Sequence, residues 1–384
     1  MAIAHYASSC HLHYFLRHLR PFSTTIIAEF GKPQPKLFAI DSEVKHLVKD
    51  RKFTEIETLL EEKMKDATNI NQESYFATII VSYAYANMLN RAHAIFDNMP
   101  NLGFTASRTS LSLNALLTSY AHDGQHSRVP DLLADLSKKH FIAPNSISYG
   151  ILINSLCKLG SPEKACETLE EMEEKKMKVS PFTYTPIIDA FYKMKKKEEA
   201  EKMWVKMVGS GCMPDHAVFN VKATYISNYG KPGEMLELME EMEKTGIKPD
   251  IVTFNLLISC YCKNGKLLDA KNLYSNLKEK NVRPNAATYR NFSRLLCKNK
   301  DFDMGFKVCK EGIMKKKYPD FVPAKILVEG LVKNEKKEEA EWICGVLKKK
   351  FPPRFIDSWK KMMEKLELNV VNDEGMRQSE GVIV

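Results

Sequence analysis

Cysteine and histidine are two residue types in this 384-residue chain that can bind a metal or act as a nucleophile or base. Cys260 and Cys262 are two positions apart, which on a helix directs their side chains to nearly opposite faces and prevents them from sharing a metal ion. His122 and His126 have a helical spacing, but the Asp-Gly pair at 123–124 is typical of a helix break. We therefore predict no catalytic residue, metal site, cofactor or small-molecule substrate.

Lysine runs are the second feature with chemical potential, because clustered cations bind polyanions. The formal net charge is +9, and residues 286–361 alone contain 19 Lys and Arg against 10 Asp and Glu. For the run at 195–197, a solvated surface and a binding role stay equally open. In the C-terminal region the excess favours contact with a polyanion.

A repeat of 35 residues must position these side chains. Pro214, Pro249, Pro284 and Pro319 are spaced by this period, and alanine and methionine columns follow it. Such a period is the signature of a repeat architecture. The predicted units are 37–72, 73–109, 110–145, 146–180, 181–215, 216–250, 251–285, 286–320 and 321–355.

Each unit is predicted to form two helices. In unit 251–285, apolar residues recur with a helical period over 254–262 and again over 267–277. Gly265 and Pro284 end the two stripes, since glycine adopts the left-handed cap conformation and proline cannot continue a helix. One hairpin cannot bury both stripes, so the units must stack. We predict an all-α, right-handed α-solenoid of about nine hairpins, and the sequence has no apolar run long enough to span a membrane.

The two ends of the chain differ from the repeats. Residues 1–28 contain no acidic residue, and an apolar stripe over 12–19 lies beside Arg17 and Arg20. This composition predicts a mitochondrial transit peptide, with a plastid address or a disordered basic N-terminus as the alternatives. Residues 356–368 are predicted to form a helix that caps the last unit, and the polar residues 369–384 a flexible tail.

The repeats also resemble a known family. Ile-Val-Thr-Phe-Asn at 251–255, Cys-Lys-Asn-Gly at 262–265 and Arg-Pro-Asn at 283–285 look like a pentatricopeptide repeat (PPR), as do the equivalent residues of the units around them. The 35-residue period is similar to that of the P class in plant organelles, whereas tetratricopeptide repeats have a 34-residue period. The resemblance implies a solenoid that reads single-stranded RNA with one base per repeat.

The resemblance assigns base reading to the fifth and last residues of a unit and base packing to the second residue. The alternative is that these polar residues only start helices. The pairs suggest C, no clear base, G, U and C in order along the RNA. They are Asn114/Asn145, Gly150/Ser180, Thr185/Asp215, Asn220/Asp250 and Asn255/Asn285, with Leu111, Phe182 and Val252 as the packing residues.

The last two units carry long cations at the fifth position, which suit phosphate better than base edges. The predicted phosphate contacts are Arg290, Lys315, Lys316, Lys317, Lys325, Lys348, Lys349 and Lys350. Four readable repeats are too few to select one transcript. We therefore expect a structural component of the mitochondrial ribosome in the matrix that contacts rRNA and ribosomal proteins, and no membrane. A free factor that processes or stabilises mRNA is the alternative, and a purely protein-binding scaffold is a third possibility.

Overall fold

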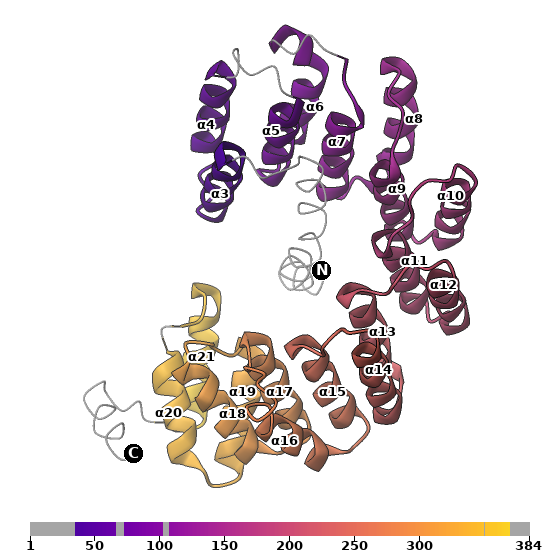
Figure 1. The fold of residues 1–384 in the computed structure, drawn as a ribbon. Helices are drawn as coiled ribbons and strands as arrows, with labels where there is room; N and C mark the ends of the chain where they lie inside the picture. The colour runs from indigo at the N-terminus through magenta and orange to yellow at the C-terminus, as the bar shows by residue number, and fades with distance from the viewer. Residues whose placement is uncertain (1–34, 67–72, 103–106, 349, 369–384) are drawn as a thin grey trace. The chain divides into compact units, whose positions relative to one another are not determined.

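The computed structural model describes residues 35–66, 73–102, 107–348 and 350–368 (Figure 1). These residues form 19 α-helices and two short 3-10 helices, and they contain no strand. No described helix is both long and apolar enough to cross a membrane. The predicted transit peptide (1–28) and tail (369–384) lie outside the described residues. The chain divides into two compact units, Met1–Met213 and Pro214–Val384, which we call the N-terminal and C-terminal units.

The N-terminal unit consists of five helical hairpins. In each, a first helix packs against a second helix, and successive first helices (α5 on α7, α7 on α9, α9 on α11) also pack side by side (Figure 1). The helices are α3 (Pro35–Lys49), α4 (Phe53–Asp66), α5 (Glu73–Tyr85), α6 (Leu89–Asn98), α7 (Ser110–His122), α8 (Val129–His140), α9 (Ser146–Lys158), α10 (Pro162–Glu174), α11 (Pro181–Lys193) and α12 (Lys197–Gly209).

The C-terminal unit repeats the same arrangement. First helices α13, α15, α17 and α19 pack in a row, and α21 packs on α19 at the end. The helices are α13 (His216–Tyr229), α14 (Pro232–Lys244), α15 (Ile251–Lys263), α16 (Leu267–Ser275), α17 (Ala286–Lys298), α18 (Phe302–Met314), α19 (Phe321–Lys333), α20 (Lys337–Leu347) and α21 (Pro353–Lys365). The predicted all-helical solenoid of stacked hairpins is confirmed.

The turns follow from local backbone chemistry. α15 ends where Gly265 takes a φ of 73°, the left-handed conformation that glycine adopts without steric cost. The same repeat position holds Lys195 and Lys300 in other hairpins, with φ of 61° and 59°. Stacking of the hairpins therefore imposes the turn even where a side chain disfavours it.

Helix α21 covers the end of the C-terminal unit. It begins at Pro353, earlier than the expected Ile356, because proline is well suited to the first turn of a helix. Trp359 is only 1% exposed and packs against Phe321 and Phe351 of the last hairpin. This cluster shields apolar side chains that a further repeat would otherwise cover.

Candidate nucleic-acid interface

The last residue of a unit is the N-cap of the next first helix. Asp250 Oδ1 accepts hydrogen bonds from the backbone N–H groups of Val252 (2.9 Å) and Thr253 (3.1 Å). Asp215 caps α13 in the same way, and Asn285 Oδ1 accepts from Thr288 N at 3.0 Å. The helix-start role of these residues is therefore real, and it fixes the orientation of each side chain.

Capping leaves a second polar atom on each of these side chains. In Asp250 the atom is a carboxylate oxygen, which can only accept, and in Asn285 it is the amide Nδ2, which can only donate. Uracil and guanine present an N–H at the centre of the Watson–Crick edge, whereas cytosine and adenine present a bare nitrogen there. An aspartate cap therefore suits U or G, and an asparagine cap suits C or A, in agreement with the predicted assignments.

The fifth and last residues of a unit lie side by side. Asn114 Nδ2 donates to Asn145 Oδ1 at 3.0 Å, and Arg290 Nη1 lies 3.8 Å from Asp320 Oδ1. Both pairs join position five of one unit to its last position. Two side chains from these positions can therefore address one base.

The Asn114/Asn145 pair is already satisfied within the protein. Asn114 has no exposed surface, and its Oδ1 accepts a hydrogen bond from Ser148 Oγ at 2.6 Å. Asn145 Nδ2 donates to Ser110 Oγ at 3.0 Å. The expectation that Asn114 meets a base edge is not compatible with this burial. We therefore do not assign a base to the Asn114/Asn145 pair.

The fifth residues of the C-terminal unit have a different environment. Asn255 is partly exposed, and its side chain makes no hydrogen bond to the described residues. Asn220 is partly exposed as a residue, but its Oδ1 is buried and has no hydrogen-bond partner among the described residues. In the N-terminal unit, the hydroxyl of Thr185 donates to Pro181 O at 2.6 Å and keeps its acceptor capacity.

The predicted base-packing residues Leu111, Phe182 and Val252 are all partly buried. Leu111 and Phe182 pack against the core of the N-terminal unit, so each has one face on the protein. The Phe182 ring lies over Gly150, where an added Cβ would come within 2.4 Å of Phe182 Cε1. Gly150 is the fifth residue of unit 146–180, and the ring of Phe182 therefore occupies the space that a side chain at this position would take.

The predicted phosphate lysines fall into two groups. Lys316, Lys317 and Lys348 are exposed and have no ionic partner in the described structure, whereas Lys349 lies outside the described residues. The others make internal contacts: Lys315 with Glu311 and Tyr289, Arg290 with Asp320, Lys325 with Glu329, and Lys350 over the ring of Tyr318.

A further basic column, at the C-terminal ends of the first helices, was missed in the sequence. Its members share the thirteenth position of a unit, and the 35-residue spacing is the signal that could have revealed them. Burial and repulsion from Lys193 lower the pKa of Lys158, and burial with repulsion from Arg294 and Lys298 lowers that of Lys263. Cations that repel one another in this way favour an added anion. The column is Lys158 and Lys193 in the N-terminal unit and Lys263, Lys298 and Lys333 in the C-terminal unit.

The cysteines and histidines provide no reactive centre in the described part of the chain. Burial raises the pKa of Cys157 and of Cys297 to about 12, so both thiols stay protonated at neutral pH. α7 ends at His122 and Gly124 has a φ of 81°, so the helix that would align His122 with His126 is interrupted. Among the described residues, no group of three potential ligands is placed to hold a metal.

Stacked helical hairpins, with a column of polar side chains that cap the first helices, define a repeat protein of the α-solenoid class. The model of the PPR repeat family matches residues 144–193 and 249–298, and that of the PPR repeat matches 182–212. The mitochondrial pentatricopeptide repeat-containing protein At2g18520 of Arabidopsis thaliana is 40% identical over 88% of this chain and 79% of its own length. The chain belongs to the pentatricopeptide repeat family, and the mitochondrial location predicted from its N-terminal segment is confirmed.

Two further similarities bear on fold and role. The small ribosomal subunit protein mL103 (rPPR7) of Arabidopsis thaliana is 38% identical over 88% of this chain and 81% of its own length. The crystal structure of PPR10 in complex with an 18-nt psaJ RNA element is 20% identical, with a TM-score of 0.59 over 82% of this chain. The match spans 48% of the PPR10 chain, and at this identity it supports the fold alone.

Proposed function

We propose that this protein binds single-stranded RNA in mitochondria. The side chains that cap the first helices read the bases, and the helix-end lysines hold the phosphates. The observation that carries the proposal is the cap geometry, because Asp215, Asp250 and Asn285 are each fixed by one polar atom and keep the other for a base. Asn220/Asp250 and Asn255/Asn285, both within the C-terminal unit, are the pairs that we assign to U and C. Thr185/Asp215 stays a sequence-based prediction of G, because Thr185 lies in the N-terminal unit and Asp215 in the C-terminal unit.

We further propose that the RNA is rRNA and that the protein is a structural, non-catalytic component of the mitochondrial ribosome. Without the Asn114/Asn145 pair, the readable word has three bases and recurs by chance about once in 64 nucleotides, given one base per repeat. Such a word is too short to select one transcript, but it suffices for RNA that a large particle already presents. The similarity to a protein named as a ribosomal subunit supports this role.

The phosphate part of the proposal is tested by salt titration with a fixed single-stranded RNA. Replacement of Lys263, Lys298 and Lys333 by glutamine should reduce the slope of log affinity against log salt by about 0.7 for each lost contact. The matched control replaces Lys316, Lys317 and Lys348 by glutamine. These predicted phosphate lysines follow the second helices α18 and α20 and not the first helices that carry the column, so we expect the slope to change less. Equal slopes for the helix-end variant and the unmodified protein would show that the column of helix-end lysines does not contact phosphate.

The ribosomal part is tested by gradient fractionation of mitochondrial lysate together with sequencing of crosslinked RNA. We expect the protein to sediment with a ribosomal subunit and to crosslink at discrete positions of rRNA. Sedimentation as a free protein with crosslinks at one mRNA end would instead support the transcript-protecting alternative. RNA binding, measured by salt titration, and ribosome association, measured by fractionation, can fail separately.

A further inference from the structure

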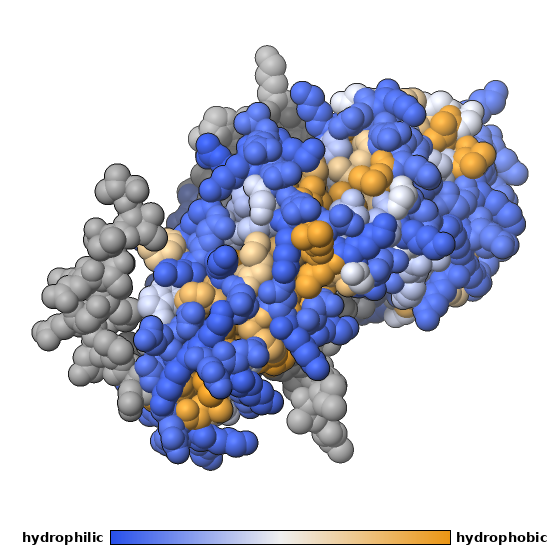
Figure 2. Space-filling model, turned by 90° about the horizontal axis from the view of Figure 1, so that it is seen from below, coloured by the Kyte–Doolittle hydropathy of each residue, from blue (hydrophilic) through white to orange (hydrophobic). Residues whose placement is uncertain are grey.

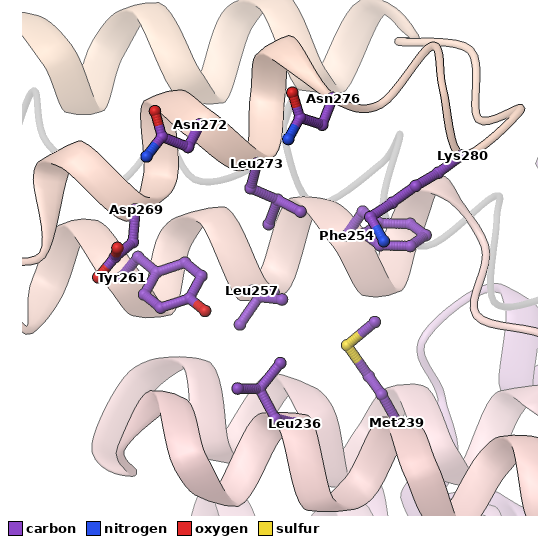
Figure 3. A pocket seen from close by; sticks show the side chains of 10 residues that line it. All are labelled: Leu236, Met239, Phe254, Leu257, Tyr261, Asp269, Asn272, Leu273, Asn276 and Lys280. Carbon is purple, nitrogen blue, oxygen red and sulfur yellow. The ribbon is translucent and has the colours of Figure 1, made fainter.

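A cavity of about 300 Å³ lies between the second helices of two successive repeats in the C-terminal unit (Figure 3). Leu236 and Met239 of α14 point across it toward Leu273 of α16, and Leu257 of α15 lies between them. This size is at the lower end of ligand-binding pockets. The second helices α14 and α16 line the cavity together with Phe254, Leu257 and Tyr261 of the first helix α15, but none of the base-reading residues or helix-end lysines lines it.

Exposed apolar side chains extend the cavity onto the surface. Leu236 is 44% exposed, and Leu268, one helical turn before the lining residue Asn272, is 70% exposed. Figure 2 shows hydrophobic side chains gathered in small groups among hydrophilic ones on one face of the molecule. Apolar surface of this kind, surrounded by polar residues, is typical of a protein-binding site.

The shape of the cavity depends on an unusually short helix. α16 has 9 residues, whereas the second helices α14 and α18 on either side of it have 13 each. Because α16 ends at Ser275, the lining residues Asn276 and Lys280 belong to a turn. The turn supplies polar groups at one end of the apolar cavity.

The charge beside the cavity is mainly negative, with Lys280 as the one cation among the residues that line it. α14 contains five glutamates and one lysine. Glu240 and Glu243 follow Leu236 and Met239 by four residues and so share their face of the helix. Both are exposed and have no ionic partner in the described structure, and Asp269 of α16 lines the cavity itself. This charge repels RNA phosphate and attracts cationic side chains.

We propose that this cavity, with its acidic border, binds a Lys- and Arg-rich segment of a partner protein. An aliphatic or aromatic side chain of that segment enters between Leu236 and Leu273, and its cationic side chains pair with Glu240, Glu243 and Asp269. A buried apolar anchor surrounded by polar contacts is the usual arrangement of a binding hot spot. The proposal does not depend on base reading, because no base-reading residue lines the cavity.

The test places the photocrosslinking residue benzoylphenylalanine at Leu268 of the full chain in plant mitochondria. The matched control carries it at Glu198, the same repeat position on α12, which is also exposed. We expect Leu268 to form an adduct with a protein segment rich in Lys and Arg. The E240K/E243K double variant should lower its yield about tenfold or more, while RNA affinity should not fall, because the variant gains positive charge.

Several results would overturn the proposal. They are an adduct with RNA, an adduct with residues 1–34 of this chain, a yield no higher than at Glu198, and a yield that survives the charge reversal. Leu236→Ala should also reduce the yield about tenfold, because it removes an apolar wall without altering charge. RNA affinity measured on the same variants separates this outcome from a failure of RNA binding.

Discussion

The Asn114/Asn145 pair of the N-terminal unit and the Asn255/Asn285 pair of the C-terminal unit have the same residue types at the same repeat positions. In the first pair Asn114 is fully buried, and both amides are used in hydrogen bonds within the protein. In the second pair Asn255 is partly exposed, and its side chain makes no hydrogen bond to the described residues. Identical residues in one column therefore serve structure in one repeat and are available for RNA in another.

The difference is explained by neighbouring residues. Ser110, the first residue of its unit, accepts a hydrogen bond from Asn145 Nδ2, whereas Ile251 at the same position near Asn285 has no polar side-chain atom. Ser148 and its equivalent Thr288 both bond to the N-cap asparagine of their helix, but only Ser148 also donates to the fifth residue, Asn114, at 2.6 Å. A code based on two residues per repeat is thus incomplete without the residues that compete for their polar atoms.

The largest effect that we predict is on stability. Asn114→Ala should destabilise the N-terminal unit by about 2–3 kcal/mol, because it removes two hydrogen bonds and leaves a void where a side chain without exposed surface was packed. Asn255→Ala, the matched change, should cost less than about 0.5 kcal/mol. Thermal melts of both variants measure the difference. Equal losses would mean that the two asparagines have the same structural role.

A second prediction concerns base preference. Asn285→Asp replaces the free amide donor by an acceptor, so it should shift the preference at that position from C to U by about 1–2 kcal/mol, on the scale of side-chain to base pairs. Asn145→Asp should not change base preference, because that side chain is bonded to Ser110 and Asn114. Competition binding with RNAs that differ at one base measures both. A shift for Asn145→Asp would place that pair back in the reading set.

The helices could be predicted closely from the sequence. Apolar residues with a helical period are separated by Gly and Pro every 35 residues, and the structure has the two helices α15 and α16 where unit 251–285 shows its two stripes. Each hairpin packs mainly on its neighbours, so local pattern and tertiary structure agree. The early end of α16 has no such signal, since its apolar residues continue to Leu277.

The site was less predictable than the fold. Repeat position indicated which side chains share a column, but not which of their atoms are already bonded. Lys315 is an exposed lysine in the sequence pattern, yet it bonds to Glu311 and lies over the ring of Tyr289. Its partners lie 4 and 26 residues away. Only the folded hairpin brings such groups together, so a charge run alone cannot identify a free cation.

This Tyr-Glu-Lys contact occurs in both units and allows a further comparison. Tyr149, Glu171 and Lys175 form it in the N-terminal unit, with all three side chains hydrogen-bonded to one another. In the C-terminal unit the equivalent Glu311 also accepts a hydrogen bond from Tyr274 at 2.6 Å, so both of its oxygens are used. We expect the second version to contribute more to stability.

Glu311→Gln should therefore lower the free energy of unfolding by about 1–2 kcal/mol, because an amide bonds less well than a carboxylate to Lys315 and the two tyrosines. Glu171→Gln should cost less than about 1 kcal/mol, since Glu171 is 47% exposed and solvent screens its ion pair. Denaturant titrations compare the two variants. A larger loss for Glu171→Gln would reverse this ranking.

The smallest predicted effect is the pH dependence of the same contact. Burial raises the pKa of Glu311, but the hydrogen bonds from Lys315 and Tyr274 outweigh it and hold the pKa below the ordinary value of 4.5. A carboxyl with a lowered folded-state pKa stabilises the protein above pH 4.5, and this contribution is lost as the pH falls through the folded-state value. The difference in melting temperature between the unmodified protein and Glu311→Gln should thus be constant from pH 7 to about 5 and shrink below that. A difference that persists at pH 3 would show that glutamine acts through packing and not through the charge of Glu311.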